Sequence, residues 1–389
     1  MALPLSYNVR NVRQRWRVTL LAVIGIALVV AVFAVLMSMS AGFENALRST
    51  GREDNVIIVQ RGSASELTSA VPLDQRQMIL ADDRIARRPD GQPMASWEWV
   101  VVIALPKKTD GQPTNVTLRA VIPQTFEVRG GIKIVAGRGF QPGLDEVIVG
   151  RKIMDRIQGL DLDGDLVYEQ KRFKIVGVFE SEGQAFESEV WGDFDVLGAS
   201  FNRGVGSNSV VARMKNPTDI RPLNKWIRAQ PQMQLRALSE KRYYEVQAGS
   251  LAKILSGLAA AVAIITGVGA VFGAMNTMNA VVAARTREIG TLRALGFSRR
   301  AILFSFVLES TLLALVGGFV GVLLAFPMNG FSTGTGQTQS FSEIAFAFRI
   351  TPLIIAEGLV FAAFMGAIGG LLPAARAARM PISRALREV

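Results

Sequence analysis

The chain has 389 residues, of which half are hydrophobic, and it contains no cysteine and no histidine. Their absence excludes histidine acid/base chemistry, cysteine nucleophiles and ordinary zinc sites. A net charge of +11 suits a nucleic-acid-binding protein. This charge lies in three short segments that flank long apolar runs, at residues 1–43, 285–300 and 373–389, so we expect no nucleic-acid partner.

The first apolar run follows a basic segment, residues 1–17, that we interpret as a cytoplasmic amphipathic helix. Residues 18–43 carry no charge and exceed the roughly 20 residues needed to cross a bilayer. A cleaved signal peptide is the alternative, but its apolar region is shorter, about 7–15 residues. Further apolar runs occupy residues 251–284, 301–328 and 352–375, so we predict four transmembrane helices.

The arginines predict the orientation of these helices, because Lys and Arg in short loops near membrane spans stay in the cytoplasm. This rule places both termini, the loop 285–300 and the tail 376–389 in the cytoplasm. Residues 44–250 and the loop 329–351 then lie outside. The predicted fold class is an α-helical membrane protein with four transmembrane helices plus a large α+β extracytoplasmic domain between helices one and two.

Strand and turn signals dominate the outer domain. Alternating or β-branched runs predict strands at residues 55–60, 97–105, 116–121, 209–214 and 233–238, and helices at 72–81 and 217–229. These pieces can close into one mixed sheet of the split β-α-β kind, with a mostly β subdomain inserted at about residues 124–208.

The helix of the second span is predicted to begin outside the membrane, at about residue 239, and to continue to residue 284. At 1.5 Å per residue it would be a rod of about 65–70 Å, roughly twice the membrane thickness. In the alternative, Gly249 breaks the helix and the external turns form only a linker.

Each of spans two, three and four contains a Gly-x-x-x-Gly pattern, which leaves a flat strip for close helix packing and favours a tightly packed helical unit or a dimer. The glycines are Gly269 and Gly273, Gly317 and Gly321, and Gly366 and Gly370. Two carboxylates, Glu309 and Glu357, lie inside spans three and four. They are either a substrate or proton site or structural partners, with Glu309 paired to an arginine at the cytoplasmic end of another helix; the shallow depth favours the structural interpretation.

The loop between spans two and three is predicted to form a short helix. Ile289, Leu292 and Leu295 recur every three residues, so we expect them on one face, with arginines beside them. Gly296 suits the end of this helix and Ser298 the N-cap of the next. The spacing fits both a membrane-surface anchor and a docking surface for a soluble partner.

Residues 276–303 (NTMNAVVAARTREIGTLRALGFSRRAIL) closely resemble the signature of the FtsX-like permeases, in particular the MacB branch of ABC transporters. Residues 372–387 (LPAARAARMPISRALR) resemble the family's C-terminal motif, and residues 9–25 its basic N-terminal helix. This resemblance favours the docking interpretation and implies an ATPase-coupling role for the polar and apolar side chains of the loop: Arg285, Arg287, Glu288, Ile289, Leu292, Arg293 and Leu295.

The resemblance further implies a homodimeric permease in the bacterial inner membrane with a periplasmic outer domain. Because the chain begins almost directly at the first span and has no Gly-x-x-x-x-Gly-Lys-Ser/Thr motif, we expect a separate cytoplasmic ABC ATPase to bind ATP and Mg²⁺. The expected function is ATP-driven export or extraction of periplasmic or membrane cargo, with a possible periplasmic adaptor. A signalling permease that regulates a cell-envelope enzyme, and lipoprotein or lipid extraction, are the alternatives; we expect no catalytic, cofactor or metal site in the chain.

Overall fold

The computed structural model describes residues 16–336 and 342–381. The chain divides into two compact units. Gly42–Ala252 and Ser332–Ala347 form an α/β unit, and the rest of the described chain forms a helical unit. The expected basic helix at residues 1–17 lies outside the described residues except for its last two, and so does the end of the expected tail, residues 382–389.

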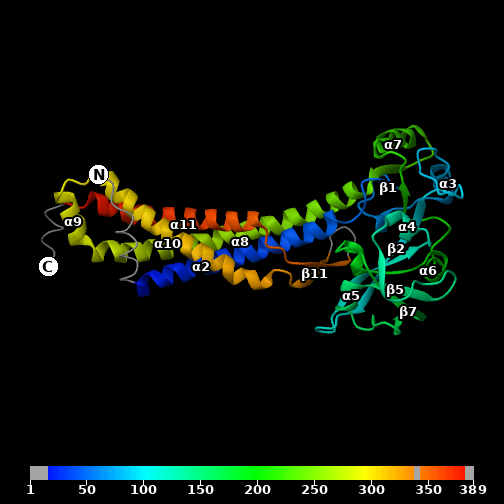
Figure 1. Ribbon diagram of the computed structural model, residues 1–389, viewed down its shortest axis with the longest axis horizontal. Helices are drawn as coiled ribbons and strands as arrows, with labels where there is room; N and C mark the ends of the chain where they lie inside the picture. Colours follow the sequence, from blue (N-terminus) through cyan, green and yellow to red (C-terminus); the bar gives the residue numbers. More distant parts are fainter. Residues whose placement is uncertain (1–15, 337–341, 382–389) are drawn as a thin grey trace. The chain divides into compact units, whose positions relative to one another are not determined.

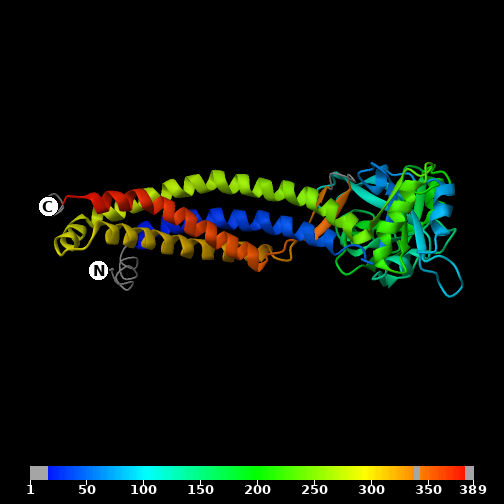
Figure 2. The same ribbon diagram turned by 90° about the horizontal axis from the view of Figure 1, so that it is seen from above.

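Four long helices carry the apolar runs: α2 Trp16–Arg48, α8 Glu240–Ala284, α10 Arg299–Ala325 and α11 Pro352–Arg379. Among the described residues, these four are long and apolar enough to cross a membrane. Within the helical unit they lie alongside one another in both views (Figure 1, Figure 2). Ser298 caps α10 by accepting a hydrogen bond from the backbone N–H of Ala301, as the sequence predicts.

Two of the three glycine pairs pack inside the helical unit. A Cβ at Gly317 or Gly321 would meet the backbone of α2, 2.9 Å from the Val23 carbonyl oxygen in the first case. The pair on α11 packs against α10, with Gly366 against Ala314 and Gly370 against Ser310. Close approach of this kind requires glycine, because any larger side chain would push the helices apart.

The third pair is different. A Cβ added at Gly269 or Gly273 of α8 would have no atom within 4 Å. Both glycines are exposed, so this pair does not pack within one copy of the chain, and its expected packing in a dimer stays a prediction. Together with residues of α2 they line an open groove rather than a packed contact.

The α/β unit is built on a mixed sheet with the order β10-β1-β9-β2-β3-β8-β5-β7-β4, and β6 pairs with β7. The strands and the helices between them span the following residues: β1 Asn55–Gln60, α3 Leu73–Leu80, β2 Ala95–Pro106, β3 Pro113–Val121, α4 Thr125–Arg129, β4 Lys133–Gly137, β5 Glu146–Gly150, α5 Arg151–Met154, β6 Asp165–Tyr168, β7 Lys171–Glu180, β8 Glu189–Asp193, α6 Phe194–Ser200, β9 Ser209–Arg213, α7 Ile220–Ala229 and β10 Leu235–Ser239.

The first four neighbours, β10-β1-β9-β2, are all antiparallel and form the predicted split β-α-β arrangement. α3 and α7 cover these strands, with Ile79 and Ile227 buried against Val56 and Ile58. β3 continues from β2 and starts the second half of the sheet, to which β4 to β8 belong. The apolar residues that alternate along these strands form a second core around Val149 and Phe173.

The loop between α10 and α11 contains a hairpin that the sequence analysis did not predict. β11 Ser332–Gly336 pairs antiparallel with β12 Glu343–Ala347. Glu343 fixes it to the α/β unit by accepting a hydrogen bond from Thr114 and pairing with Arg156. Phe346 packs edge-on against Phe43 at the end of α2, with ring centroids 5.7 Å apart.

α8 is one continuous helix of 45 residues. It begins at Glu240, directly after β10, and passes through Gly249 without a break. The alternative in which Gly249 breaks the helix is therefore wrong. That the first turns of α8 lie outside the membrane stays a prediction.

Candidate functional site

The loop between α8 and α10 forms the short helix α9, Thr286–Ala294. It is shorter than the expected range of 285–300, because Gly296 turns the chain with φ +93. The backbone N–H of Phe297 donates to the carbonyl of Leu292, 3.1 Å away, which closes the end of the helix.

Arg285 connects the start of α9 to its surroundings. Its guanidinium lies 2.9 Å from Glu288 in the first turn and 2.9 Å from Glu309 on α10, and it stacks on Phe306. Arg285 and Glu309 are both buried. This ion pair fits the structural interpretation of Glu309, because the partner of Glu309 is an arginine at the end of another helix.

Ile289 lies in the interior, with only 1% of its surface exposed. It belongs to an apolar cluster formed by the ends of α8, α10 and α11, with Met278, Ile302 and Ala377 among its members. Ile289 therefore binds α9 to its own chain rather than presenting an apolar surface, and its expected role in ATPase coupling stays a prediction.

Leu292 and Leu295 are progressively more exposed, and Leu295 is 72% exposed after the end of the helix. A repeat of three residues turns about 60° backwards at each step of a 3.6-residue helix, so Ile289 and Leu295 point about 120° apart. The three apolar side chains do not share one face.

Arg293 and Arg287 have different environments. Arg293 donates to the backbone carbonyl of Ala378, 2.7 Å away at the C-terminal end of α11, where a cation is favourable. Arg287 is exposed. The surface that α9 leaves for a partner thus consists of Arg287, Leu295 and the small side chains between them, Thr291 and Ala294.

Glu357 is not near this site. It lies in the second turn of α11, and its Oε2 is buried without a hydrogen-bond partner among the described residues. The structure therefore separates the two intramembrane carboxylates that the sequence analysis grouped together. Within residues 16–336 and 342–381, no group of three or more acidic, His or Cys side chains could hold a metal ion.

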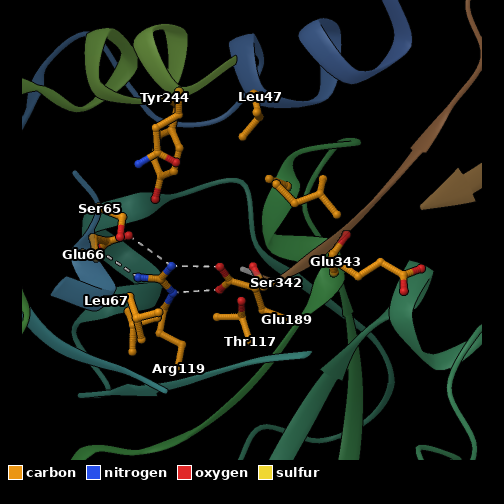
Figure 3. A pocket seen from close by; sticks show the side chains of 15 residues that line it. Leu47, Ser65, Glu66, Leu67, Thr117, Arg119, Glu189, Tyr244, Ser342 and Glu343 are labelled. Atoms are coloured by element: carbon orange, nitrogen blue, oxygen red, sulfur yellow. Dashed lines mark hydrogen bonds and ion pairs between the residues drawn. The ribbon is translucent and has the colours of Figure 1, made fainter. Parts of the chain in front are cut away.

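A second polar site lies in the α/β unit, where α8 begins. Arg119 of β3 is buried and donates to three carboxylates, Glu66 at 3.0 Å, Glu98 at 2.7 Å and Glu189 at 2.7 Å; Figure 3 draws the first and the last of these contacts. Tyr244 of α8 lines the same cavity, whose volume is about 40 Å³. That volume accommodates about three water molecules but no organic substrate.

Arg129 extends this buried ion cluster to the first residue of α8. It donates to Glu98 of β2 at 2.6 Å and to Glu240 at 2.5 Å. Glu240 also accepts a hydrogen bond from Asn55 of β1 at 2.8 Å. The cluster, formed by Arg119, Arg129, Glu66, Glu98, Glu189 and Glu240, therefore attaches the start of α8 to the sheet.

Two carboxyls of the cluster have opposite pKa shifts. Burial alone raises the pKa of Glu98, but the charges of Arg129 and Arg119 outweigh it and lower this pKa to about 2. Burial raises the pKa of Glu240, and the Arg129 charge only partly offsets the effect. Glu98 thus stays charged in acid, whereas Glu240 takes up a proton more readily than an exposed glutamate.

The sequence analysis did not identify this cluster. A signal for it is present in the sequence, because Glu98 and Arg119 are the single charged residues of otherwise uncharged strands. A charge at such a position is buried only when it is paired. The residues that pair with these two charges come from distant parts of the chain, so no local sequence pattern identifies them.

Two family models match the chain. The FtsX-like permease C-terminal family matches residues 260–382, which include α9. The MacB-like periplasmic core domain matches residues 19–230, which include most of the α/β unit.

The chain is also similar to individual proteins. The macrolide export ATP-binding/permease protein MacB of Wolinella succinogenes is 23% identical over 392 residues, covering 93% of this chain and 57% of that protein. An ABC transporter permease of Bacillus subtilis, YknZ, is 26% identical over 298 residues, 71% of each chain. The periplasmic region of MacB from Actinobacillus actinomycetemcomitans aligns with a TM-score of 0.38 and 10% identity, covering 51% of this chain and 94% of that one. The chain spans little more than half the length of its MacB relative.

Proposed function

The chain belongs to the FtsX-like permeases with a MacB-like periplasmic core domain, and from this premise we propose that it is the permease subunit of a MacB-type ABC transporter. In this proposal a separate cytoplasmic ABC ATPase binds ATP and Mg²⁺ and docks on α9. The resulting movement passes along α8 to the α/β unit, which exports or extracts periplasmic or membrane cargo with an adaptor.

The continuity of α8 carries the proposal. Its last residue, Ala284, is followed at once by Arg285 and α9, and its first residue, Glu240, belongs to the buried ion cluster. Both ends are thus held by charged, buried contacts. A helix held in this way can transmit a displacement only if it does not bend, and α8 has no proline along its length.

The contacts of α9 support the same mechanism. Arg285, Ile289 and Arg293 attach it to α10, to the apolar cluster and to α11. A partner that pushes on α9 therefore acts on several helix ends together.

The exposed glycines of α8 support a second copy of the chain as a partner. Gly269 and Gly273 line a groove of about 370 Å³ between α8 and α2, to which Gly25 of α2 also contributes. An apolar strip without side chains suits close helix–helix contact in a membrane. In the proposed arrangement this groove is the dimer interface in the bacterial inner membrane, the α/β unit is periplasmic, and both termini are cytoplasmic.

The test is to reconstitute the full chain in nanodiscs with a candidate ABC ATPase from the same genome and to measure ATP hydrolysis. We expect stimulation by the wild-type chain and a loss of at least about tenfold with Arg287→Glu combined with Leu295→Asp, because a charge reversal and a buried carboxylate both oppose docking. Both side chains are exposed, so this variant keeps the fold.

Ile289→Asp serves as the contrasting variant. Because Ile289 is buried, this change should unfold the end of the helical unit and lower thermal stability as well as stimulation. Unaltered stimulation by the double variant at Arg287 and Leu295 would exclude α9 as the docking surface.

A further inference from the structure

A cleft of about 490 Å³ opens in the α/β unit, away from the buried ion cluster. The side chains around it are aromatic, apolar or cationic, with one carboxylate, Asp195. Its walls come from α3, β2, α6 and the segment before β9, and its chief members are Arg76, Trp97, Trp99, Phe194 and Arg203. Its volume lies in the range of sites that bind small organic molecules.

The alternation of β2 explains how the strand serves two sites. Side chains two residues apart share one face of a strand, so Trp97 and Trp99 face the cleft while Glu98 faces the buried ion cluster. Phe194 stacks on Trp99 with ring centroids 6.4 Å apart and meets Trp97 edge-on at 6.5 Å. The three rings form a continuous aromatic wall.

Arg76 is a buried cation without an ion pair. Only 9% of its surface is exposed, and its guanidinium lies over the Trp97 ring, 4.8 Å from the centroid. Its one hydrogen bond to a described residue is a long one, 3.5 Å, to the Gly206 carbonyl. Asp195 is exposed and acts on Arg76 only through its charge at a distance, since no described carboxylate forms an ion pair with Arg76. A buried charge with so little compensation is costly.

Trp99 contributes a second unsatisfied donor. The residue is 8% exposed, and its indole Nε1 is buried without a hydrogen-bond partner in the described chain. Indole N–H groups usually find an acceptor when they are buried. Gly198 of α6 keeps the space beside it open, because a Cβ there would lie 3.7 Å from the Trp99 nitrogen.

We propose that this cleft binds a small amphipathic anion: a carboxylate that accepts from Arg76 and from the Trp99 indole, carried on an apolar or aromatic body that packs between the rings. The exposed Arg203, whose guanidinium lies 5.6 Å from the Trp99 ring centroid, adds a second positive charge at the entrance. The two arginines exceed the single Asp195, so the cleft favours anions over cations. The site lies wholly in the α/β unit and does not depend on the proposed ATPase.

The test uses the full chain in nanodiscs and 2-naphthoate as the probe, with binding measured by isothermal titration calorimetry. The neutral 2-naphthamide is the matched control ligand, because it keeps the ring system and removes the charge. We expect naphthoate to bind at least about tenfold more tightly than the amide, as charge-assisted hydrogen bonds are stronger than neutral ones. Equal affinity for the two, or no binding of naphthoate, would overturn the proposal.

Two variants locate the site. Arg76→Gln should weaken naphthoate binding about tenfold and leave amide binding almost unchanged, because only the charge is removed. Gly198→Ala adds a methyl group beside the indole nitrogen at ordinary contact distance, on a helix that tolerates alanine, and should weaken both ligands. Arg221→Gln, at an exposed arginine of α7, is the control and should leave both affinities intact. If naphthoate bound equally well to the Gly198→Ala and wild-type chains, the cleft would not be the site.

Discussion

Arg285 and Glu309 form an ion pair of 2.9 Å between the residue that precedes α9 and the middle of α10, and neither side chain is more than 7% exposed. The pair fixes the start of α9 at the point where α8 ends. Because Arg285 also holds Glu288 in the first turn of α9, one guanidinium joins three consecutive helices of the helical unit.

Replacement of Glu309 by alanine should therefore loosen α9. Arg285 would keep Glu288 but lose its buried partner on α10, at a cost of about 1–3 kcal/mol in the free energy of unfolding. We expect a lower thermal midpoint in detergent and faster hydrogen exchange of the α9 amides. Glu357→Ala is the control, since the Oε2 of Glu357 has no hydrogen-bond partner among the described residues; equal exchange of α9 in both variants would contradict the role of the ion pair.

The glycine pairs predict two separable effects. Gly366→Val combined with Gly370→Val should destabilise the monomer, because the new side chains would overlap Ala314 and Ser310 of α10. Gly269→Val combined with Gly273→Val should leave monomer stability nearly unchanged and weaken the dimer, because both positions are open in a single copy. Thermal unfolding and the oligomeric state in nanodiscs or mild detergent distinguish the two. A dimer that survives the second pair of substitutions would place the interface elsewhere.

The parts of the fold that could be predicted are those with a local physical cause. An uncharged run such as residues 18–43 needs no partner to be recognised as a span, and Ser298 caps α10 through its own backbone neighbours. The split β-α-β order of β10-β1-β9-β2 followed from the alternation of strands and helices.

The parts that could not be predicted depend on contacts between distant residues. Spacing alone does not distinguish Gly269 and Gly273, which are open, from Gly317 and Gly321, which pack on α2. The sequence analysis expected Ile289 and Leu295 on one face because they belong to a repeat of three residues. In a helix with 3.6 residues per turn their side chains point in different directions, and one is buried while the other is exposed. The hairpin β11–β12 is held by Glu343 through residues more than 180 positions away, so its structure has little local signal.

The buried ion cluster predicts a pH dependence with two parts. The raised pKa of Glu240 means that the folded chain binds this proton more tightly than the unfolded chain. Its stabilising contribution is therefore fully present below the ordinary value of 4.5 and is lost as the pH rises. Glu98 acts in the opposite direction, because its pKa falls to about 2: its contribution is present above 4.5 and is lost as the pH falls toward 2. That second contribution is on the order of 3 kcal/mol.

We expect the stability of Glu240→Gln relative to the wild type to improve as the pH rises above about 4.5, and to level off once the folded Glu240 carboxyl has lost its proton, since the variant has no proton to lose. Thermal unfolding at a series of pH values measures this difference. Glu53→Gln is the matched control, at an exposed residue that pairs with Lys241 beside Glu240. Parallel curves for wild type and Glu240→Gln would show that the Glu240 carboxyl does not titrate as its buried position implies.

Gly249 gives the sharpest test of α8 as the transmitting element. It lies within the continuous helix, is half-buried, and a Cβ there would meet no atom within 4 Å. Gly249→Ala should therefore stabilise the helix by up to about 1 kcal/mol. Gly249→Pro removes a backbone hydrogen bond, clashes with the preceding turn and kinks the helix.

In nanodiscs with the ATPase, Gly249→Pro should preserve stimulated hydrolysis, because α9 and its contacts are unchanged. It should abolish the ATP-dependent change in distance between spin labels placed on α7 of the two copies, measured by pulsed electron paramagnetic resonance, while Gly249→Ala retains that change. An undiminished distance change in the proline variant would mean that movement reaches the α/β unit by a route other than α8.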